Sequence, residues 1–344
     1  MKEGELVTRV LDKYGFKVLS YGKIRSVYKV KTNKGTICLK KFKHGKYKAS
    51  NGSFLVQELY KNDFFNTPNY ICTKNKNLFV KYKSLFFYVT EWVDGIECDL
   101  SEINETKNCA KLLARFHLAT HKIDCEKLKI RNNLRNWPEV YKNKLYDFNK
   151  YEKIIASKMI KNTFDIVYRD NIQKFYNIGL ITLTILNNSK YYKLSEIANK
   201  EHTICHDSFY YQNIIKKEDR YYIIDLDSII IDLQVNDLGK FIRRLMYKSS
   251  YKWEFKKAEE IIESYNTVNK LSKDELEVML ALIMFPHKFW KLGKKRYFDF
   301  KNWNEKKYVH KLNKIIKYGE LQQKFLEDYI QYLDRYDKNF SKEG

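Results

Sequence analysis

Residues that interrupt secondary structure are scarce in this sequence, which has 3 prolines and 12 glycines among 344 residues. That scarcity leaves little room for long flexible linkers. The first five residues, Met1 to Glu5, contain no apolar signal core, and no uninterrupted apolar stretch approaches the roughly 18 residues that a membrane span needs. We therefore expect a protein without a signal peptide or a membrane span, made and folded in the cytoplasm.

Short motifs of several enzyme and metal-site classes are missing as well. The 6 cysteines include no C-x-x-C pair and no regular framework, so a reducing compartment fits, with Cys38 and Cys205 as buried free thiols. There is no G-x-x-x-x-G-K-[ST] loop, G-x-S-x-G elbow or G-x-G-x-x-G fingerprint. His117 and His121 have the spacing of a zinc pair on a helix, but no glutamate follows His117 as a hydrolytic zinc site requires.

Acidic residues are few relative to basic ones, since 42 Asp and Glu against 65 Lys and Arg give a formal net charge of +23 at pH 7. Such a surface can neutralise phosphates of a nucleic acid or a nucleotide, or contact another anionic surface. The lysines are scattered, and no RNA- or DNA-binding motif accompanies them, so we do not expect sequence-specific nucleic-acid binding. A charged, solvated surface that reflects A/T-rich coding is the simpler interpretation.

The hydrophobic pattern divides the chain into a β-rich first part and a helical remainder, and a hydrophobic fraction of 44% indicates a folded protein. These features predict an α+β fold with two lobes, a small β-rich lobe over residues 1–95 and a large helical lobe over 96–344. The expected strands lie at 16–21, 27–31, 36–42, 78–81 and 86–92, with a loop at 22–25 and a hairpin turn at 33–35. The expected helices lie at 54–65, 109–120, through most of 120–200, and at 237–247, 254–265, 273–284 and 304–333.

The most informative segment begins at His206, reaches Asn213 seven positions later, and continues into an apolar strand that ends in Asp225 and Asp227. This spacing is typical of a kinase catalytic loop and the metal-binding strand that follows it. In such sites the asparagine oxygen and the first aspartate hold the Mg²⁺ that bridges the ATP phosphates. We predict Asn213 and Asp225 as metal ligands, Asp227 as an assisting ligand, and His206 as a brace for the backbone. Alternatively, the two aspartates cap a turn at the mouth of the strand.

The catalytic base of such a site is displaced in this sequence. Kinases of this class place the catalytic aspartate two residues after the histidine, and that position is Ser208. A neutral serine cannot take the proton of an acceptor hydroxyl without a partner. The carboxylate of Asp207 lies one position early, and it replaces the missing base only if the loop rewinds or contains a bulge. The sequence therefore predicts a kinase-like fold and leaves enzyme activity open.

Lys40 ends the apolar strand 37–40 and is predicted to contact the α- and β-phosphates of the nucleotide. Because side chains alternate along a strand, Lys41 is expected to face the opposite side, toward solvent. Glu58, on the helix that follows, is the predicted ion-pair partner of Lys40. The alternative is that both lysines are surface residues that end a strand.

Two further segments have predicted roles at this site. Glu91 and Val93 lie where a hinge between the lobes would expose backbone groups to adenine. The single Gly22 before the second strand is more typical of a turn than of a phosphate-covering loop, which has three glycines in protein kinases. Asp237 is a candidate for a hydrogen bond from the start of a helix back to the catalytic loop.

These motifs resemble the CotS-type family of bacterial spore coat proteins, which is related to aminoglycoside phosphotransferases and choline kinases. The similarity covers nearly the whole chain, and the segment Pro286-His287-Lys288-Phe289-Trp290 narrows it to the coat-protein branch. The segments that carry the resemblance are 35–43, 88–95, 113–117, 204–206, 211–213, 237–241, 285–290 and 325–326.

The resemblance implies a protein made in the mother cell and laid down on the forespore as part of the spore coat, with other coat proteins as partners. It also implies ATP and Mg²⁺ as cofactors, with metal roles for Asn213 and Asp225 and a phosphate role for Lys40. The family's proton-accepting aspartate does not carry over, because Ser208 occupies its position. Three functions stay open. The favoured one is a kinase-like, nucleotide-binding coat component acting in coat assembly. The others are an active ATP- and Mg²⁺-dependent phosphotransferase acting on a hydroxyl of a small molecule, sugar or protein, and a general anion binder.

Overall fold

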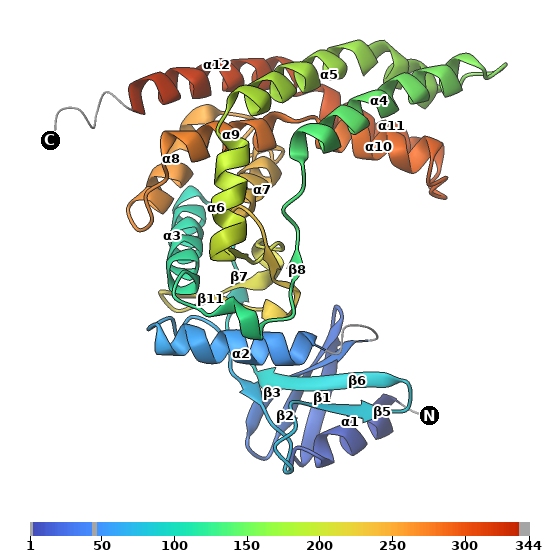
Figure 1. Cartoon of the computed structure of the whole chain (residues 1–344). Coiled ribbons are helices and arrows are strands. Elements are labelled where there is room, and N and C mark those ends of the chain that lie inside the picture. Colours follow the sequence, from blue (N-terminus) through green and yellow to red (C-terminus); the bar gives the residue numbers. More distant parts are fainter. Residues whose placement is uncertain (1–2, 43–46, 337–344) are drawn as a thin grey trace, which may run out of the picture. The chain divides into compact units, whose positions relative to one another are not determined.

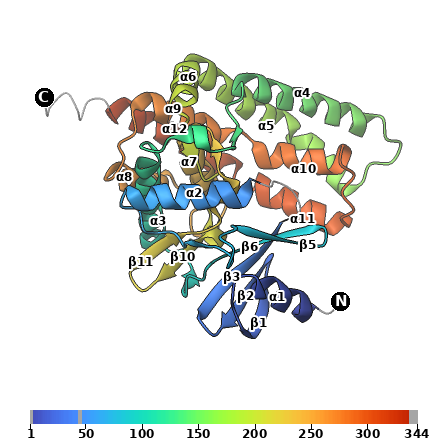
Figure 2. The same ribbon diagram turned by 60° about the horizontal axis from the view of Figure 1, so that its bottom comes forward.

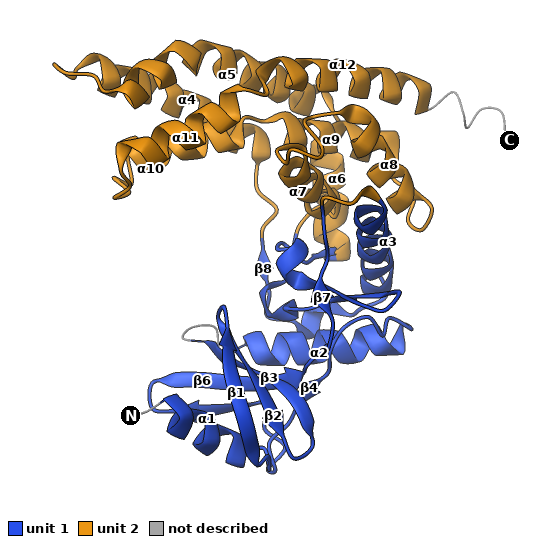
Figure 3. Cartoon of the chain, turned by 180° about the vertical axis from the view of Figure 1, so that it is seen from behind, with its two compact units in different colours: residues 1–100, 104–132, 202–231 blue, residues 101–103, 133–201, 232–344 orange. Residues whose placement is uncertain are grey.

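The structure of the chain (Figure 1) is a computed structural model that describes residues 3–42 and 47–336. All predicted site residues lie in these ranges, whereas Lys43, the last residue of the 35–43 motif, lies outside them. The chain forms two compact units (Figure 3): unit 1 comprises Met1–Leu100, Asn104–Asn132 and His202–Ile231, and unit 2 comprises Ser101–Ile103, Asn133–Glu201 and Asp232–Gly344. Each unit is assembled from three separate segments of the chain. The lobe boundary predicted at residue 95 stays a prediction.

Unit 1 contains an antiparallel sheet with the strand order β1-β2-β3-β6-β4, to which β5 is added through β6. Its strands are β1 (Val18–Ile24), β2 (Val27–Thr32), β3 (Gly35–Phe42), β4 (Tyr70–Ile71), β5 (Phe79–Tyr82) and β6 (Leu85–Glu91). Helix α1 (Glu3–Asp12) packs on the sheet through Val7, Val10 and Leu11, which share a core cluster with Leu39 and Phe87. The register places Lys40 of β3 opposite Tyr88 of β6, which positions both side chains for the site described below.

The rest of unit 1 is built from two helices and two small sheets. Helix α2 spans Lys48–Lys61, and α3 spans Ile103–Thr120. One sheet joins β11 (Arg220–Ile223), β10 (Ile214–Lys217) and β7 (Ile96–Glu97), and the other joins β8 (Arg131–Asn132), β12 (Ile230–Ile231) and β9 (Ile204–Cys205). Gly95, the residue before β7, lies so close to β10 that a Cβ atom there would overlap the carbonyl oxygen of Lys216. These two sheets flank the loop that begins at His206.

Unit 2 is helical in its described residues (Figure 2). Its helices are α4 (Trp137–Ala156), α5 (Thr163–Asn188), α6 (Tyr191–Glu201), α7 (Val235–Met246), α8 (Phe255–Asn266), α9 (Lys273–Met284), α10 (His287–Tyr297), α11 (Glu305–Ile316) and α12 (Gly319–Tyr336). Helix α9 is the central one, since it packs against α5, α7 and α12 and buries every residue from Val278 to Met284. Its start is fixed by a capping box between Ser272 and Glu275. No helix in residues 3–42 and 47–336 has the length and apolar character of a bilayer span.

Several sequence expectations about local structure need correction. The loop predicted at 22–25 is wrong, because β1 continues through Ile24 and the turn follows at Arg25, which has a φ of 53°. The single helix predicted at 304–333 is also wrong, because the chain turns at 317–318 between α11 and α12. Helix α2 begins six residues before its predicted start, since its first turns bury small or polar residues such as Ala49 and Ser53 that give no hydrophobic period.

Candidate nucleotide and metal site

An ion-pair network centred on Lys40 lies within unit 1. The Lys40 ammonium forms an ion pair with Asp225 and lies 3.2 Å from Oδ2 of Asp227. Burial alone would lower the pKa of Lys40, but the two carboxylates raise it above its ordinary value. The neighbouring Lys41 is exposed, as strand alternation predicted, whereas only 18% of the Lys40 side chain is exposed. The sequence thus directs one of the two lysines into the site.

Asp227 is the buried anchor of this network, with 1% of its side chain exposed. Its Oδ2 accepts a hydrogen bond of 2.8 Å from the Tyr88 hydroxyl, and its Oδ1 accepts one of 2.8 Å from Ser228. Lys48 of α2 approaches Oδ1 to 3.8 Å. Burial would raise the pKa of Asp227, but the Lys40 and Lys48 ammonium groups and the Tyr88 hydroxyl help to lower that pKa to about 2. Asp227 is therefore a fixed negative charge whose two oxygens already have protein partners.

Asp225 is the more accessible carboxylate, with 34% of its side chain exposed. Its backbone is left-handed, at φ 70° and ψ 44°, a conformation that aspartate and asparagine tolerate better than most residues. The hairpin of β10 and β11 brings Asn213 close to it, because the Ile224 amide donates a 3.0 Å hydrogen bond to the Asn213 carbonyl. Two residues that were predicted as metal ligands therefore lie on adjacent ends of one hairpin.

The Asn213 side chain is oriented by the loop that precedes it. Its Nδ2 donates a 3.0 Å hydrogen bond to the carbonyl oxygen of Ser208. Because the amide nitrogen is used in this way, the amide oxygen is the group that remains for a cation. Amide and carboxylate oxygens are ligands that Mg²⁺ accepts in proteins.

His206 connects the loop to the strand before Asp225. Its side chain is fully buried, and its Nε2 lies 3.0 Å from the carbonyl oxygen of Ile224. The Ser208 amide donates a 3.2 Å hydrogen bond to the other ring nitrogen, Nδ1. Because Nδ1 accepts this bond, the ring proton lies on Nε2 and is donated to Ile224. The histidine thus links the backbone of the loop, at Ser208, to the backbone of the residue before Asp225.

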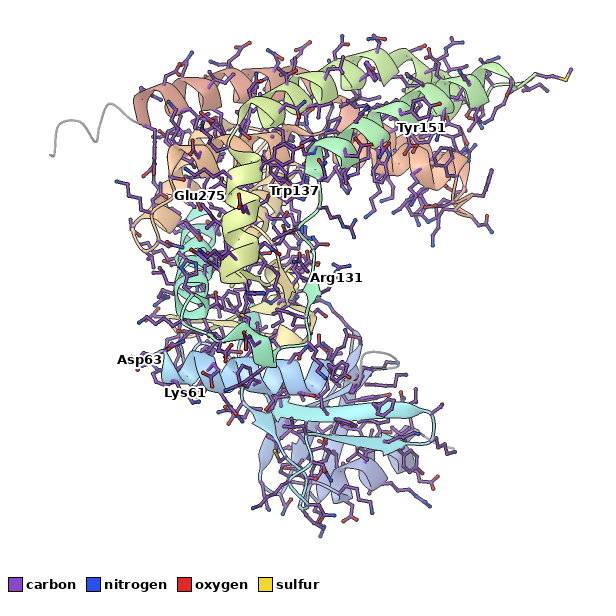
Figure 4. All side chains as sticks on the ribbon, viewed as in Figure 1. Lys61, Asp63, Arg131, Trp137, Tyr151 and Glu275 are labelled. Atoms are coloured by element: carbon purple, nitrogen blue, oxygen red, sulfur yellow. The ribbon has the colours of Figure 1, made fainter. Side chains whose placement is uncertain are left out.

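The two candidate residues for the catalytic base have different surroundings. The amide and carbonyl groups of Ser208 bond to His206 and Asn213, so this residue links the two side chains through its backbone. Asp207 has a left-handed backbone, at φ 63°, and its carboxylate lies 3.9 Å from the guanidinium of Arg131, a residue labelled in Figure 4. The Asp207 side chain is 28% exposed.

The structure gives Lys40 a different partner from the one that we predicted. Glu58 pairs instead with Lys61, labelled at the end of α2 in Figure 4, at 2.6 Å and on the same helix. Within the described ranges, the ion pairs of Lys40 are with Asp225 and Asp227. A strand lysine and a helix glutamate can be matched from the sequence only by analogy, because any surface helix carries glutamates.

The other predicted residues lie in β6, in the segment after it and in α7. Glu91 is exposed and accepts a 3.0 Å hydrogen bond from the Asn69 amide, and Val93 is half-buried in the irregular segment between β6 and β7. Their hinge role stays a prediction. Asp237 is buried in the first turn of α7 in unit 2, and its bond to the loop stays a prediction too.

Three residues at the network were not anticipated from the sequence: Lys48, Tyr88 and Ser228. Tyr88 could have been identified from the sequence, because antiparallel pairing of the predicted strands 36–42 and 86–92 places it opposite Lys40. Its ring stacks on Tyr70 at a centroid distance of 5.2 Å, and burial raises its pKa well above the ordinary range, so it stays a hydrogen-bond donor. Lys48 and Ser228 carry no comparable sequence signal.

The sequence matches the family described as "Spore coat putative kinase YutH" over residues 8–329. The chain belongs to this family. It is 24% identical over 335 residues to "Spore coat protein S" of Bacillus subtilis (strain 168), covering 94% of each protein. The family that the sequence motifs suggested is therefore confirmed.

The fold of this chain is also similar to solved structures of phosphotransferases. An aminoglycoside phosphotransferase from Alicyclobacillus acidocaldarius superposes with a TM-score of 0.86 at 16% identity, covering 95% of this chain and 96% of that one. A spectinomycin phosphotransferase in complex with ADP and spectinomycin gives a TM-score of 0.64 at 13% identity, covering 94% and 98%. Because these identities are low, the likeness concerns the fold. The predicted two-lobed, aminoglycoside phosphotransferase-like α+β fold is confirmed.

Proposed function

We propose that this chain is a spore coat component whose kinase-like site binds ATP together with a divalent cation and transfers phosphate slowly or not at all. The observation that carries the nucleotide part is the grouping of Lys40, Asp225 and Asp227 beside the hairpin end that holds Asn213. Membership of the coat family and the similarity to a coat protein over 94% of the chain support the coat part. In assembly its partners would be other coat proteins.

Binding of Mg²⁺ and ATP exchanges partners within the Lys40 network. Without ligand, the ammonium of Lys40 neutralises Asp225. The accessible Asp225 carboxylate and the Asn213 oxygen would hold a divalent cation, and Lys40 would then pair with the nucleotide phosphates. Asp227 keeps its bond to Tyr88 and so holds the lysine near its position through the exchange. The charge on each member of the network is thus compensated before and after binding.

Slow transfer follows from the loop between His206 and Asn213. Ser208 has no basicity, and its backbone is committed to the two flanking side chains. Asp207 is held in a left-handed turn beside Arg131. The runner-up function is an active phosphotransferase acting on a hydroxyl, with Asp207 as base; its favouring observation is that the Asp207 carboxylate is partly exposed.

The test combines nucleotide binding with turnover. Isothermal titration of ATP into the full chain is expected to show an affinity that depends on Mg²⁺. Asp225→Asn, which keeps a residue suited to the left-handed backbone, should weaken that affinity about tenfold or more, because one charge-assisted contact contributes about 1.5–3 kcal/mol. Asp219→Asn, an exposed position in the turn between β10 and β11, is the matched control and should bind as wild type does.

Turnover then separates the two candidate functions. A coupled assay for ADP release with candidate hydroxyl acceptors, including coat proteins, should show little transfer by the wild-type chain. Rapid transfer that is lost in Asp207→Asn would establish the active phosphotransferase instead. Affinity for ATP that is the same with Mg²⁺ and with a chelator would contradict the nucleotide part of the proposal.

A further inference from the structure

A second group of charged side chains lies in unit 2 and shares no residue with the Lys40 network. It comprises Lys144 of α4, Arg243 of α7, and His287 and Lys288 at the start of α10, which we call the basic cluster. Helices α4 and α10 pack against each other (Figure 2). The cluster includes two residues of the Pro286-His287-Lys288-Phe289-Trp290 segment, to which the predicted nucleotide site gives no role.

Aromatic rings hold the side chains of the basic cluster in place. The Lys144 ammonium lies 4.9 Å from the centroid of the Trp290 ring and 5.3 Å from that of Phe285. The Lys288 ammonium lies 3.5 Å from the centroid of the Tyr247 ring. Cation–π contacts of this kind hold an ammonium without neutralising it. The positive charges are therefore positioned and still available to an anion.

Carboxylates do not compensate the basic cluster. In the described part of the chain, none of its four side chains forms an ion pair with an acidic residue, and Arg243 donates instead to the Leu282 carbonyl at 2.9 Å. Asp147 is the acidic residue that acts on Lys144, but it already accepts the Trp290 indole at 2.9 Å and lies 3.8 Å from Lys150. Positive charge thus outweighs negative charge around these side chains.

The start of helix α10 adds two hydrogen-bond donors beside the same residues, the amides of Lys288 and Phe289, whereas the His287 amide already donates to the Phe285 carbonyl at 2.6 Å. Pro286 precedes the helix and supplies no side-chain cap, and the first turn contains no acidic residue. Lys288 occupies that turn instead, although the helix dipole disfavours a cation at an N-terminus. A helix that starts without a side-chain cap and with a cation in its first turn departs from the usual preferences, and such departures are expected at functional sites. An anion there would accept from the amides of Lys288 and Phe289 and pair with the cations.

Burial and mutual repulsion act on every titratable member of the basic cluster. They lower the pKa of His287 to about 2, that of Lys288 to about 7 and that of Lys144 to about 8. Burial and the neighbouring Arg244 lower the pKa of Arg243 from its usual range. The other charged groups that act on these four are Arg135, Asp147, Lys240, Arg244, Lys291, Lys311 and Lys314. Binding of an anion would therefore relieve an unfavourable charge distribution.

We propose that the basic cluster is a binding site for a small anion with two or more negative charges, either a phosphate ester or a polycarboxylate. Lys144, Lys288 and Arg243 would pair with its charged oxygens, and the Lys288 and Phe289 amides of α10 would donate to them. A cationic ligand is excluded, because it would meet the same uncompensated charges. This assignment does not depend on whether the Lys40 network binds a nucleotide.

The test is a titration of the full chain with inorganic pyrophosphate near pH 7, at low ionic strength and without divalent cations. Wild type is expected to bind one pyrophosphate, and Lys144→Gln and Lys288→Gln should each weaken binding about tenfold, as the loss of one charge-assisted contact predicts. Lys142→Gln is the matched control, because this exposed lysine lies on the same helix outside the cluster. A parallel titration with citrate distinguishes phosphate from carboxylate recognition.

Thermal unfolding gives a second readout on the same variants. Lys288→Gln removes a disfavoured charge, so it should raise the melting temperature without ligand and abolish most of the rise that pyrophosphate produces in wild type. The proposal is overturned if neither pyrophosphate nor citrate binds. It is also overturned if Lys142→Gln loses as much affinity as the two cluster variants, since that result would mean diffuse attraction to a basic surface.

Discussion

Replacing Lys40 by methionine tests how the ion-pair network is held together. The substitution keeps an unbranched side chain one atom shorter than lysine but leaves the buried Asp227 without the ammonium that lies 3.2 Å away in the wild type. Removing one partner of a buried pair typically costs about 3–5 kcal/mol. Lys48, at 3.8 Å, still faces Asp227, and Lys40 is partly exposed, so we expect about 3 kcal/mol of lost stability, at the lower end of that range.

The stability that Lys40→Met loses should also depend on pH. In the wild type the folded pKa of Asp227 is about 2, below its ordinary value, so its contribution of about 2 kcal/mol is present above about pH 4 and disappears as the pH falls toward 2. Without Lys40, burial dominates and raises the folded pKa above the unfolded one. The folded variant then binds more protons than its unfolded chain, so its stability falls as the pH rises. Urea unfolding of wild type and Lys40→Met at pH 5 and pH 8 should therefore show a larger difference at pH 8.

The control is Lys41→Met, which removes the neighbouring exposed lysine and should change stability by less than about 0.5 kcal/mol. If Lys40→Met were as stable as this control, or lost the same amount at both pH values, the buried-pair reasoning would be refuted.

Three further outcomes follow from individual contacts. Tyr88→Phe removes the 2.8 Å hydrogen bond to Asp227 and should lower the free energy of unfolding by about 1–3 kcal/mol in urea titrations, because a buried carboxylate oxygen loses a donor; no change would mean that water replaces it. Gly95→Ala should cost about 1–3 kcal/mol, since its Cβ would overlap the Lys216 carbonyl and push β7 from β10; hydrogen exchange of β10 amides should then accelerate. Lys288 has a folded pKa of about 7, below its unfolded value, so wild-type stability should rise with pH above 7, and Lys288→Gln should flatten that rise between pH 7 and 10.

The sequence was most informative where function depends on residues that are close along the chain. The His206 to Asp227 segment predicted a loop and a hairpin, and the structure joins them through the bonds of His206 and Asn213. Alternation along β3 was enough to choose Lys40 over Lys41. The partner of Lys40 could not be found in this way, because it lies 185 residues away and the choice between Glu58 and Asp225 depends on tertiary packing.

Helix boundaries were poorly predicted where burial does not use large apolar residues. The first turns of α2 bury Ala49, Gly52 and Ser53, so the hydrophobic period becomes visible only at Phe54. The basic cluster was also hidden, because its members come from three helices and each lysine alone resembles a surface residue. A sequence with 65 basic residues gives no sign of which of them are held together.

The central claim is that Asn213 and Asp225 share one divalent cation in the presence of nucleotide. Electron paramagnetic resonance with Mn²⁺, which binds the same oxygen ligands as Mg²⁺, measures that cation directly. In the presence of ATP, wild type should bind Mn²⁺ more tightly than free ATP does, and Asn213→Ala and Asp225→Asn should each lose this gain. Equal Mn²⁺ binding by wild type and both variants would contradict the claim.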